Sequence, residues 1–433
     1  MSLSFSSPTT ARDREYRLGR TELLALISAI MALTAVAIDL MLPAFDDIRD
    51  TFGLADGSAD TGQIVTVYFF GLAIAQVFYG PLADRFGRKP TLYLGIGIYI
   101  VGAMGSALAP TFGLLLLGRF VWGAGAAGTR VVAMAIVRDR FEGDAMAKAM
   151  SQVMVVFMLV PIVAPAVGSA IVSVVPWPGL FWLCVAWALM VLLWSFRLME
   201  TLNPANRRPL NPKATFSGFA EVCRTPVTAG YTISALFLQA VFTAYLATSE
   251  VIISDIFDRR EQFALIFGSV AVLFAITVFM NGRAVDRFGI ERVVTGAFSV
   301  ILPLCALLVA LAIVGDGVPN IWLFMPTLGL ILASFMFLLP NLNSAAMTPV
   351  GDIAGTASAL TGAVRIAGGA ALGALISSQV TDSVTPFAVG VAAMCLGAAT
   401  SVWVVRYRAS RRLSVAVEAN PSSSPLSPAA SAD

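Results

Sequence analysis

Long apolar runs recur along almost the whole of this sequence, and they constrain its fold more than any other feature. Each run of about 18 or more residues can cross roughly 30 Å of hydrocarbon as a helix. Only 12% of the 433 residues are charged, and the mean hydropathy is +0.83, whereas soluble domains are about 25% charged. The ~10-residue alternating segments of a membrane β-barrel are absent. The sequence therefore predicts an all-α integral membrane protein.

The predicted spans fall into two groups of six, separated by the longest polar interval. The first group is predicted at 23–43, 63–82, 90–109, 112–136, 149–173 and 179–197, and the second at 227–248, 263–281, 293–314, 320–340, 355–378 and 384–405. The expected organisation is a cytoplasmic segment 1–22, a six-helix bundle 23–197, a linker 198–226, a second bundle 227–406 and a tail 407–433. The tail is rich in Ser, Pro and Ala, so it is predicted to be disordered.

Lysine and arginine are distributed unevenly over the segments that connect these spans. With the N-terminus inside, the inner segments hold 22 of the 28 Lys and Arg residues, and the outer segments hold only Arg49, Arg259 and Arg260. The remaining three lie within spans. Because positive residues are enriched on the cytoplasmic side of a membrane, both termini are predicted to be cytoplasmic.

A short charged segment occurs twice, once in each half. GPLADRFGRKP spans residues 80–90 and NGRAVDRFGIER spans residues 281–292. At a constant offset of 202 residues, matching pairs are Gly80 with Gly282, Asp84 with Asp286, Arg85 with Arg287, and Gly87 with Gly289. Both copies lie on the predicted cytoplasmic side, so the second half repeats the first in parallel orientation. Two such halves, related by an axis along the membrane normal, are typical of transporters with a site between them.

Residues that enzymes and metal sites commonly need are scarce. There is no His, which removes His-ligated metal and haem sites and the usual proton carrier near neutral pH. Any proton chemistry must therefore use Asp or Glu. The four Cys are scattered, and the net charge of +2 is too balanced to indicate nucleic acid binding. We expect no catalytic residue, metal or cofactor.

Several motifs resemble those of the major facilitator superfamily. GPLADRFGRKP (80–90) looks like the family's signature between spans 2 and 3, and LLLGRFVWGAGAAG (115–128) resembles its span-4 motif. PIVAPAVGS (161–169) resembles the span-5 motif of drug–proton antiporters, although Ala164 and Ser169 stand where Gly is common. IDLMLPAF (38–45) and the segment 343–365 are similar to bicyclomycin and chloramphenicol exporters. The resemblance covers residues 20–410.

This resemblance implies twelve helices in two pseudo-symmetric halves and proton-coupled efflux of small, largely apolar compounds such as drugs. The implied partners are a small-molecule substrate, protons and membrane lipid. The implied setting is a monomer in the inner membrane of a bacterium. A proton symporter or uniporter of a metabolite remains an alternative. A membrane enzyme is a weaker one, since the sequence has no GxSxG motif or metal-ligand cluster.

Asp39 is the leading candidate for proton coupling. A carboxylate within a membrane span costs free energy, so its presence there indicates a function. It lies four residues before Pro43, or about 6 Å below the outer edge. The resemblance also implies a protonatable acid here. Arg119 lies about 10 Å below the same edge and is the natural partner of Asp39 in a substrate cavity. The alternatives are an Asp39 that contacts outside water, and an Arg119 that binds helix-end carbonyls.

Two further arginines lie within spans. Arg365 is near the midplane of span 11, with no acid nearby in sequence. Because a buried unpaired cation is costly, it should face the substrate cavity, a carbonyl or an anionic group of the substrate. Arg130 lies about two turns from the inner end of span 4, where we expect it to extend to the cytoplasmic face.

The repeated hinges form a predicted cytoplasmic gate, and the span-5 motif is a further candidate. The resemblance implies that Asp84 contacts the start of span 11 when the inner gate is shut. Gly80 and Gly87 would allow close approach and turning. The gate residues are Gly80, Asp84, Arg85, Gly87, Arg88, Asp286 and Arg287, and the motif residues are Pro161, Pro165 and Gly168. The alternative is that the basic residues serve orientation alone. At the outer end of span 7, Glu250, Asp255 and Asp258 are expected to be solvated loop charges.

Overall fold

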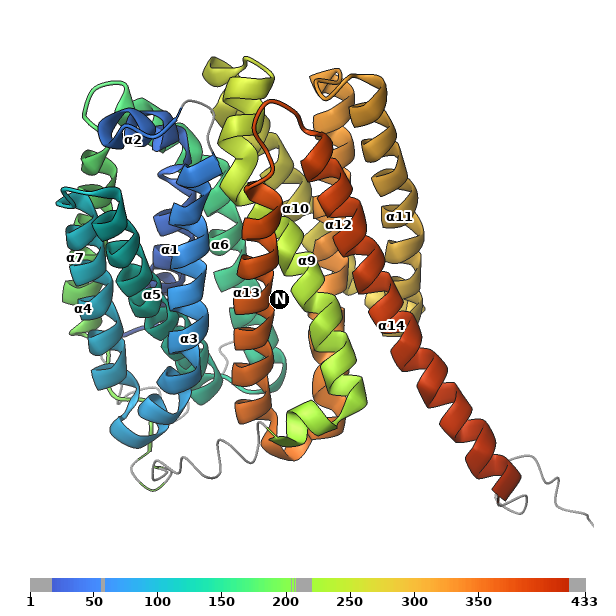
Figure 1. The fold of residues 1–433 in the computed structure, drawn as a ribbon. Coiled ribbons are helices and arrows are strands. Elements are labelled where there is room, and N and C mark those ends of the chain that lie inside the picture. Colours follow the sequence, from blue (N-terminus) through green and yellow to red (C-terminus); the bar gives the residue numbers. More distant parts are fainter. Residues whose placement is uncertain (1–17, 56–58, 204, 206, 208–219, 420–433) are drawn as a thin grey trace, which may run out of the picture.

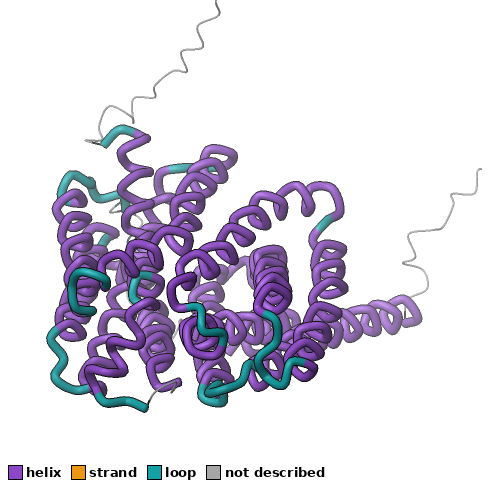
Figure 2. Tube along the Cα trace, turned by 90° about the horizontal axis from the view of Figure 1, so that it is seen from above, coloured by secondary structure: helices purple, strands orange, loops and turns teal. Residues whose placement is uncertain are grey.

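The fold follows from a computed structural model that describes residues 18–55, 59–203, 205, 207 and 220–419. The described residues form helices and no strands (Figures 1 and 2). Twelve of these helices are long and apolar enough to span a membrane, which confirms the predicted fold class.

Each half contributes six of the long helices. The first half contains α1 (Arg20–Asp39), α3 (Gly62–Phe86), α4 (Arg88–Ala107), α5 (Phe112–Arg140), α6 (Gly143–Val172) and α7 (Pro178–Ser195). The second contains α9 (Pro226–Glu250), α10 (Phe263–Phe288), α11 (Ile290–Val314), α12 (Ile321–Met347), α13 (Ala354–Ser377) and α14 (Thr385–Ala419). We call the end that holds the α7–α9 connection inner and the opposite end outer, after the orientation predicted from Lys and Arg.

Short helical segments lie at the ends of these spans. At the outer end, η2 (Leu42–Ala44), α2 (Phe45–Phe52) and η3 (Ala59–Thr61) connect α1 to α3, while η5 (Val251–Ile256) and η6 (Arg260–Gln262) connect α9 to α10. At the inner end, η7 (Thr348–Ile353) connects α12 to α13. The outer ends of the first spans of both halves therefore continue into further helical turns.

Two helix ends differ from the sequence predictions. The α-helix of span 1 ends at Asp39 and continues as η2, because Pro43 lacks a backbone N–H and restricts the residue before it. At the other end of the chain, residues 407–419 continue α14 as a helix, where we expected disorder. No Gly or Pro interrupts that stretch, and Arg, Leu, Ala and Glu favour helix. Residues 420–433 lie outside the described part.

The two halves contact each other through a small set of helices. The α3 helix packs against α13 and α9, and α6 packs against α10. Figure 1 shows α13 beside α3, with the first half on the left and most of the second on the right. Large apolar side chains such as Leu265 and Val314 are exposed, as expected for a surface that faces lipid. This surface differs from the contacts between the halves, which include the polar contacts described below.

Candidate functional site

Asp39 is the last residue of α1 and is only 4% exposed. Its carboxylate forms no hydrogen bond or ion pair with any other residue that the structure describes. The helix packed beside it is α6, where a Cβ on Gly168 would collide with the carbonyl oxygen of Leu40. Gly168 therefore permits α6 to contact the chain directly after Asp39.

Arg119 is completely buried, and its guanidinium binds backbone carbonyls. Nη1 donates to the oxygen of Ala37 at 3.0 Å and Nε donates to the oxygen of Ile64 at 3.4 Å. The guanidinium also lies 4.6 Å from the ring centroids of both Tyr68 and Trp122. The carbonyls in the last turn of a helix lack partners within that helix, so Arg119 caps α1 and joins it to α3 and α5.

The expected pairing of Asp39 with Arg119 is not observed. These two described residues form no ion pair, and the contacts of Arg119 match the alternative in which it binds helix-end carbonyls. Both side chains are nevertheless buried around the final turn of α1, so Arg119 fixes the helix end that carries Asp39. Nη2 of Arg119 has no hydrogen-bond partner among the described residues.

A cluster of charged side chains connects the two halves at the outer end, and the sequence reasoning missed it. Arg49 of α2 contacts Glu250, the last residue of α9, at 2.5 Å and Asp255 of η5 at 2.8 Å. It also contacts Asp46 on its own helix at 2.7 Å. Arg260 of η6 pairs with Asp46 and lies 3.9 Å from Asp255. We call these five residues the outer ionic cluster.

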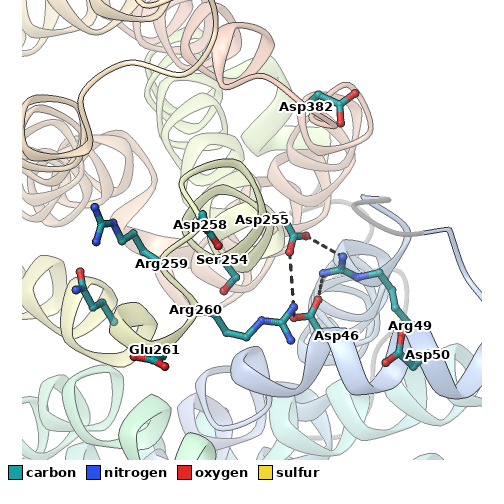
Figure 3. Close-up of a pocket in the computed structure, with 11 residues that line it drawn as sticks. Asp46, Arg49, Asp50, Ser254, Asp255, Asp258, Arg259, Arg260, Glu261 and Asp382 are labelled. Carbon is teal, nitrogen blue, oxygen red and sulfur yellow. Dashed lines mark hydrogen bonds and ion pairs between the residues drawn. The ribbon is translucent and has the colours of Figure 1, made fainter.

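The centre of the outer ionic cluster is shielded from solvent, whereas Arg260 at its edge is exposed. Arg49 is 3% exposed and Glu250 is 2% exposed, so the expectation that Glu250 is a solvated loop charge is wrong. Figure 3 shows Asp46, Arg49, Asp255 and Arg260 turned toward one another, whereas Arg259 points away. All ion pairs between the two halves among the described residues belong to this cluster. The ion pairs that join the two halves therefore lie at the outer end.

A cavity of about 820 Å³ lies over the cluster. Its lining consists mainly of charged residues: Asp46, Arg49, Asp50, Ser254, Asp255, Asp258, Arg259, Arg260, Glu261, Gln262 and Asp382. The carboxylates of Asp46, Glu250 and Asp255 come within 4.8 Å of one another, close enough to hold a metal ion. The guanidinium of Arg49 contacts all three and places a positive charge among them.

A sequence signal for the cluster did exist. Arg49 is one of only three Lys or Arg residues in the predicted outer segments. Glu250 and Asp255 follow span 7, which corresponds to span 1 in the repeat. Because spans 1 and 7 are related by the repeat, acidic and basic residues at their outer ends could have been compared as a pair.

The two inner hinges share a backbone conformation. Gly87 has φ 109° and Gly289 has φ 77°, values that favour glycine. The neighbouring side chains also correspond, because Arg85 lies over the ring of Phe86 at 5.5 Å and Arg287 lies over the ring of Phe288 at 5.3 Å. The repeat found in the sequence thus extends to local structure. Gly80 has open space around it, so no close approach occurs there in this conformation.

The charges of the first hinge are paired within the first half. Arg88 is 7% exposed and contacts Asp84 at 2.6 Å and Asp139 of α5 at 2.8 Å. Glu200 accepts from the backbone N–H groups of Arg88 and Lys89 at 2.8 and 3.0 Å. No hydrogen bond joins Asp84 to α13 among the described residues. The sequence reasoning missed Asp139 and Glu200.

Among the residues that the structure describes, the second hinge has no equivalent of this network. Asp286 and Arg287 are both exposed. The position that corresponds to Arg88 at the offset of 202 is Ile290, which cannot pair with an acid. The two hinges are therefore alike in backbone and different in how they are held.

The span-5 motif lies in a continuous helix. The α6 helix runs from Gly143 to Val172 through both Pro161 and Pro165. Gly168 provides the contact with the end of α1 described above. Arg365 of α13 donates from Nη1 to Oε1 of Gln239 on α9, so it contacts a neighbouring helix of the second half.

Comparisons with known proteins identify the family of this chain and two of its relatives. The sequence profile of the Major Facilitator Superfamily matches residues 24–374. The bicyclomycin resistance protein homolog of Haemophilus influenzae is 28% identical over 366 residues, covering 83% of this chain and 90% of that protein. Multidrug resistance protein MdtL of Vibrio parahaemolyticus is 26% identical over 343 residues, covering 78% and 84%. Both names confirm the resemblance to drug exporters seen in the motifs.

Solved structures share the fold at low sequence identity. The crystal structure of a D-xylose–proton symporter aligns with a TM-score of 0.71 at 15% identity, covering 88% of this chain and 96% of that one. The human organic anion transporter MFSD10 aligns with a TM-score of 0.63 at 18% identity, covering 87% and 99%. These likenesses concern the fold alone.

Proposed function

This chain belongs to the Major Facilitator Superfamily and is a multi-pass membrane transporter, and we propose that it exports small, largely apolar organic compounds in exchange for protons. The proposed setting is the cytoplasmic membrane of a bacterium, with both termini inside and the monomer as the working unit. The names of its relatives, which refer to drug and bicyclomycin resistance, support an exported drug-like substrate.

The observation that carries the proposal is the buried, unpaired carboxylate of Asp39. A carboxylate at this depth costs free energy when it is ionised without a partner. No described cation balances its charge, so it is suited to gain and lose a proton during a transport cycle. With no His in the chain, an acid is the natural proton carrier.

The outer ionic cluster supplies the second part of the proposed cycle. While Arg49 contacts Glu250, the outer ends of the halves stay together and Asp39 is screened from the outside. Separation of the cluster opens the outer end, which admits a proton to Asp39 and releases the substrate. Closing restores the ion pairs and gives the protonated acid access to the inside, where the proton leaves.

Transport in inside-out vesicles with an imposed pH gradient tests this function. Acidifying the vesicle interior should drive a fluorescent drug-like dye into the vesicle as protons leave it, which corresponds to export from a cell. Dye movement in the same direction as the protons would establish symport instead. Dye movement that ignores the gradient would establish uniport.

A further inference from the structure

Two arginines lie within the spans without an acidic partner. Arg365 of α13 is part-buried, and its only hydrogen bond among the described residues is to the neutral side chain of Gln239. Its Nε is buried without a partner. Arg130 of α5 is also part-buried and forms no hydrogen bond or ion pair with a described residue.

These two arginines lie at the same depth in opposite halves. Arg130 is ten residues before the inner end of α5 at Arg140, and Arg365 is eleven residues after the inner end of α13 at Ala354. At 1.5 Å per residue both lie about 15 Å from the inner end. The α3 helix packs against both α5 and α13, so the two cations lie on helices that share one neighbour, and like charges repel.

A third donor without a partner lies on α3, where α3 faces α13. Gln76 of α3 is 9% exposed and its Nε2 has no hydrogen-bond partner among the described residues. That nitrogen would be 3.4 Å from a Cβ on Gly362, one turn before Arg365 on α13. The group thus combines two guanidinium cations with a free amide N–H, and each of these offers protons to an acceptor.

Repelling cations at mid-depth in a membrane are unfavourable unless an anion joins them. Guanidinium groups match the two oxygens of a carboxylate in geometry and bind them with charge-assisted hydrogen bonds. We propose that Arg130 and Arg365, assisted by Gln76, bind the carboxylate of an organic anion between the two halves, and that the transported substrate carries this group on an apolar body. The assignment deepens the proposed transport function and rests on it for the identity of the ligand as a substrate.

Binding to the purified full chain in lipid nanodiscs tests this assignment without a proton gradient. The probes are 2-naphthoate and its neutral counterpart 2-naphthylmethanol, which share one apolar body, and affinities are measured by equilibrium dialysis. Wild-type protein should prefer naphthoate, and Arg365→Gln should weaken naphthoate binding by about tenfold or more, the usual effect of a hydrogen bond to a charged group. Binding of the alcohol should not change.

Matched variants separate this role from a general charge effect. Arg283→Gln removes the same charge from an exposed position and should keep the preference for naphthoate. Arg130→Gln should weaken naphthoate binding and leave the melting temperature without probe unchanged or higher, because it removes one of two repelling cations. A lower melting temperature would assign Arg130 a structural role and overturn its part in the site.

Other outcomes overturn the proposal directly. Equal affinity of the wild-type protein for the two probes would show that no carboxylate is recognised. Displacement of naphthoate by an equal concentration of inorganic phosphate would assign the arginines to a small counter-ion instead of an organic substrate. If the anion preference holds but transport ignores the pH gradient, the antiport mechanism fails and this site stands.

Discussion

Arg49 and Glu250 lie 201 residues apart in the chain and join the two halves through a buried contact of 2.5 Å at the outer end. Neither residue belongs to the sequence motifs of the family that we identified. Their contact is accompanied by Asp46, Asp255 and Arg260, so several charges must separate before the outer end can open. Opening of the outer end therefore costs the free energy of these charge contacts.

Glu250→Gln should shift the protein toward an outward-open conformation. Arg49 would keep Asp46 and Asp255, so the expected loss is about 1–3 kcal/mol, or roughly a 5- to 150-fold change in the equilibrium. Spin labels at Asp50 and Arg259, both exposed, should report a longer mean distance in the variant. Glu261→Gln changes an exposed acid of the same cavity lining and should leave the distance unaltered. An unchanged distribution in Glu250→Gln would remove the cluster from its role in closure.

Asp39→Asn should abolish proton coupling while leaving the protein folded. Asparagine has nearly the same shape but cannot exchange a proton, so a pH gradient should no longer drive dye accumulation in vesicles. Exchange of labelled for unlabelled dye, which needs no net proton movement, should continue. The matched control is Asp50→Asn on the exposed surface of α2, which should transport normally. Accumulation driven by the gradient in Asp39→Asn would assign the coupling to another acid.

Gly168→Ala should impair both stability and transport. The added Cβ would collide with the Leu40 carbonyl and force α6 away from the end of α1, at a cost of about 1–3 kcal/mol. Gly97→Ala on α4 meets open space and should be neutral or slightly stabilising, since Ala favours helix over Gly. Thermal unfolding followed by tryptophan fluorescence checks both variants. Equal melting temperatures would show that α6 has freedom to adjust here.

Native cysteines provide a test of the predicted orientation. Cys223, in the predicted cytoplasmic linker, is exposed, whereas Cys184, Cys305 and Cys395 are buried. A membrane-impermeant maleimide should therefore label wild-type protein in inside-out vesicles and leave it unlabelled in intact spheroplasts. Cys223→Ser should remove the labelling of inside-out vesicles. The reverse pattern of labelling would place the linker outside and invert the topology.

The features that the sequence could predict are those encoded locally. Apolar runs indicated the twelve spans, and the pattern around Gly87 and Gly289 indicated two equivalent turns. The position of Asp39 within a predicted span also singled it out. These inferences need only helix length, charge distribution and a constant offset, all of which can be read along the chain.

Contacts between distant segments could not be predicted in the same way. The partners of Arg119 are backbone carbonyls of Ala37 and Ile64, and any residue offers a carbonyl, so the sequence gives no signal for them. Arg88 was assigned to the gate without its partner Asp139, which lies 51 residues away. The expected extension of Arg130 to the cytoplasmic face stays a prediction.

The contacts of Arg119 determine how Asp39 can move. Because one buried guanidinium holds the last turn of α1 against both α3 and α5, the acid cannot shift toward either membrane face without breaking up its own bundle. Asp39 therefore keeps its position within the first bundle. In the proposed cycle, a proton reaches it from one side or the other because the opposite bundle moves across it.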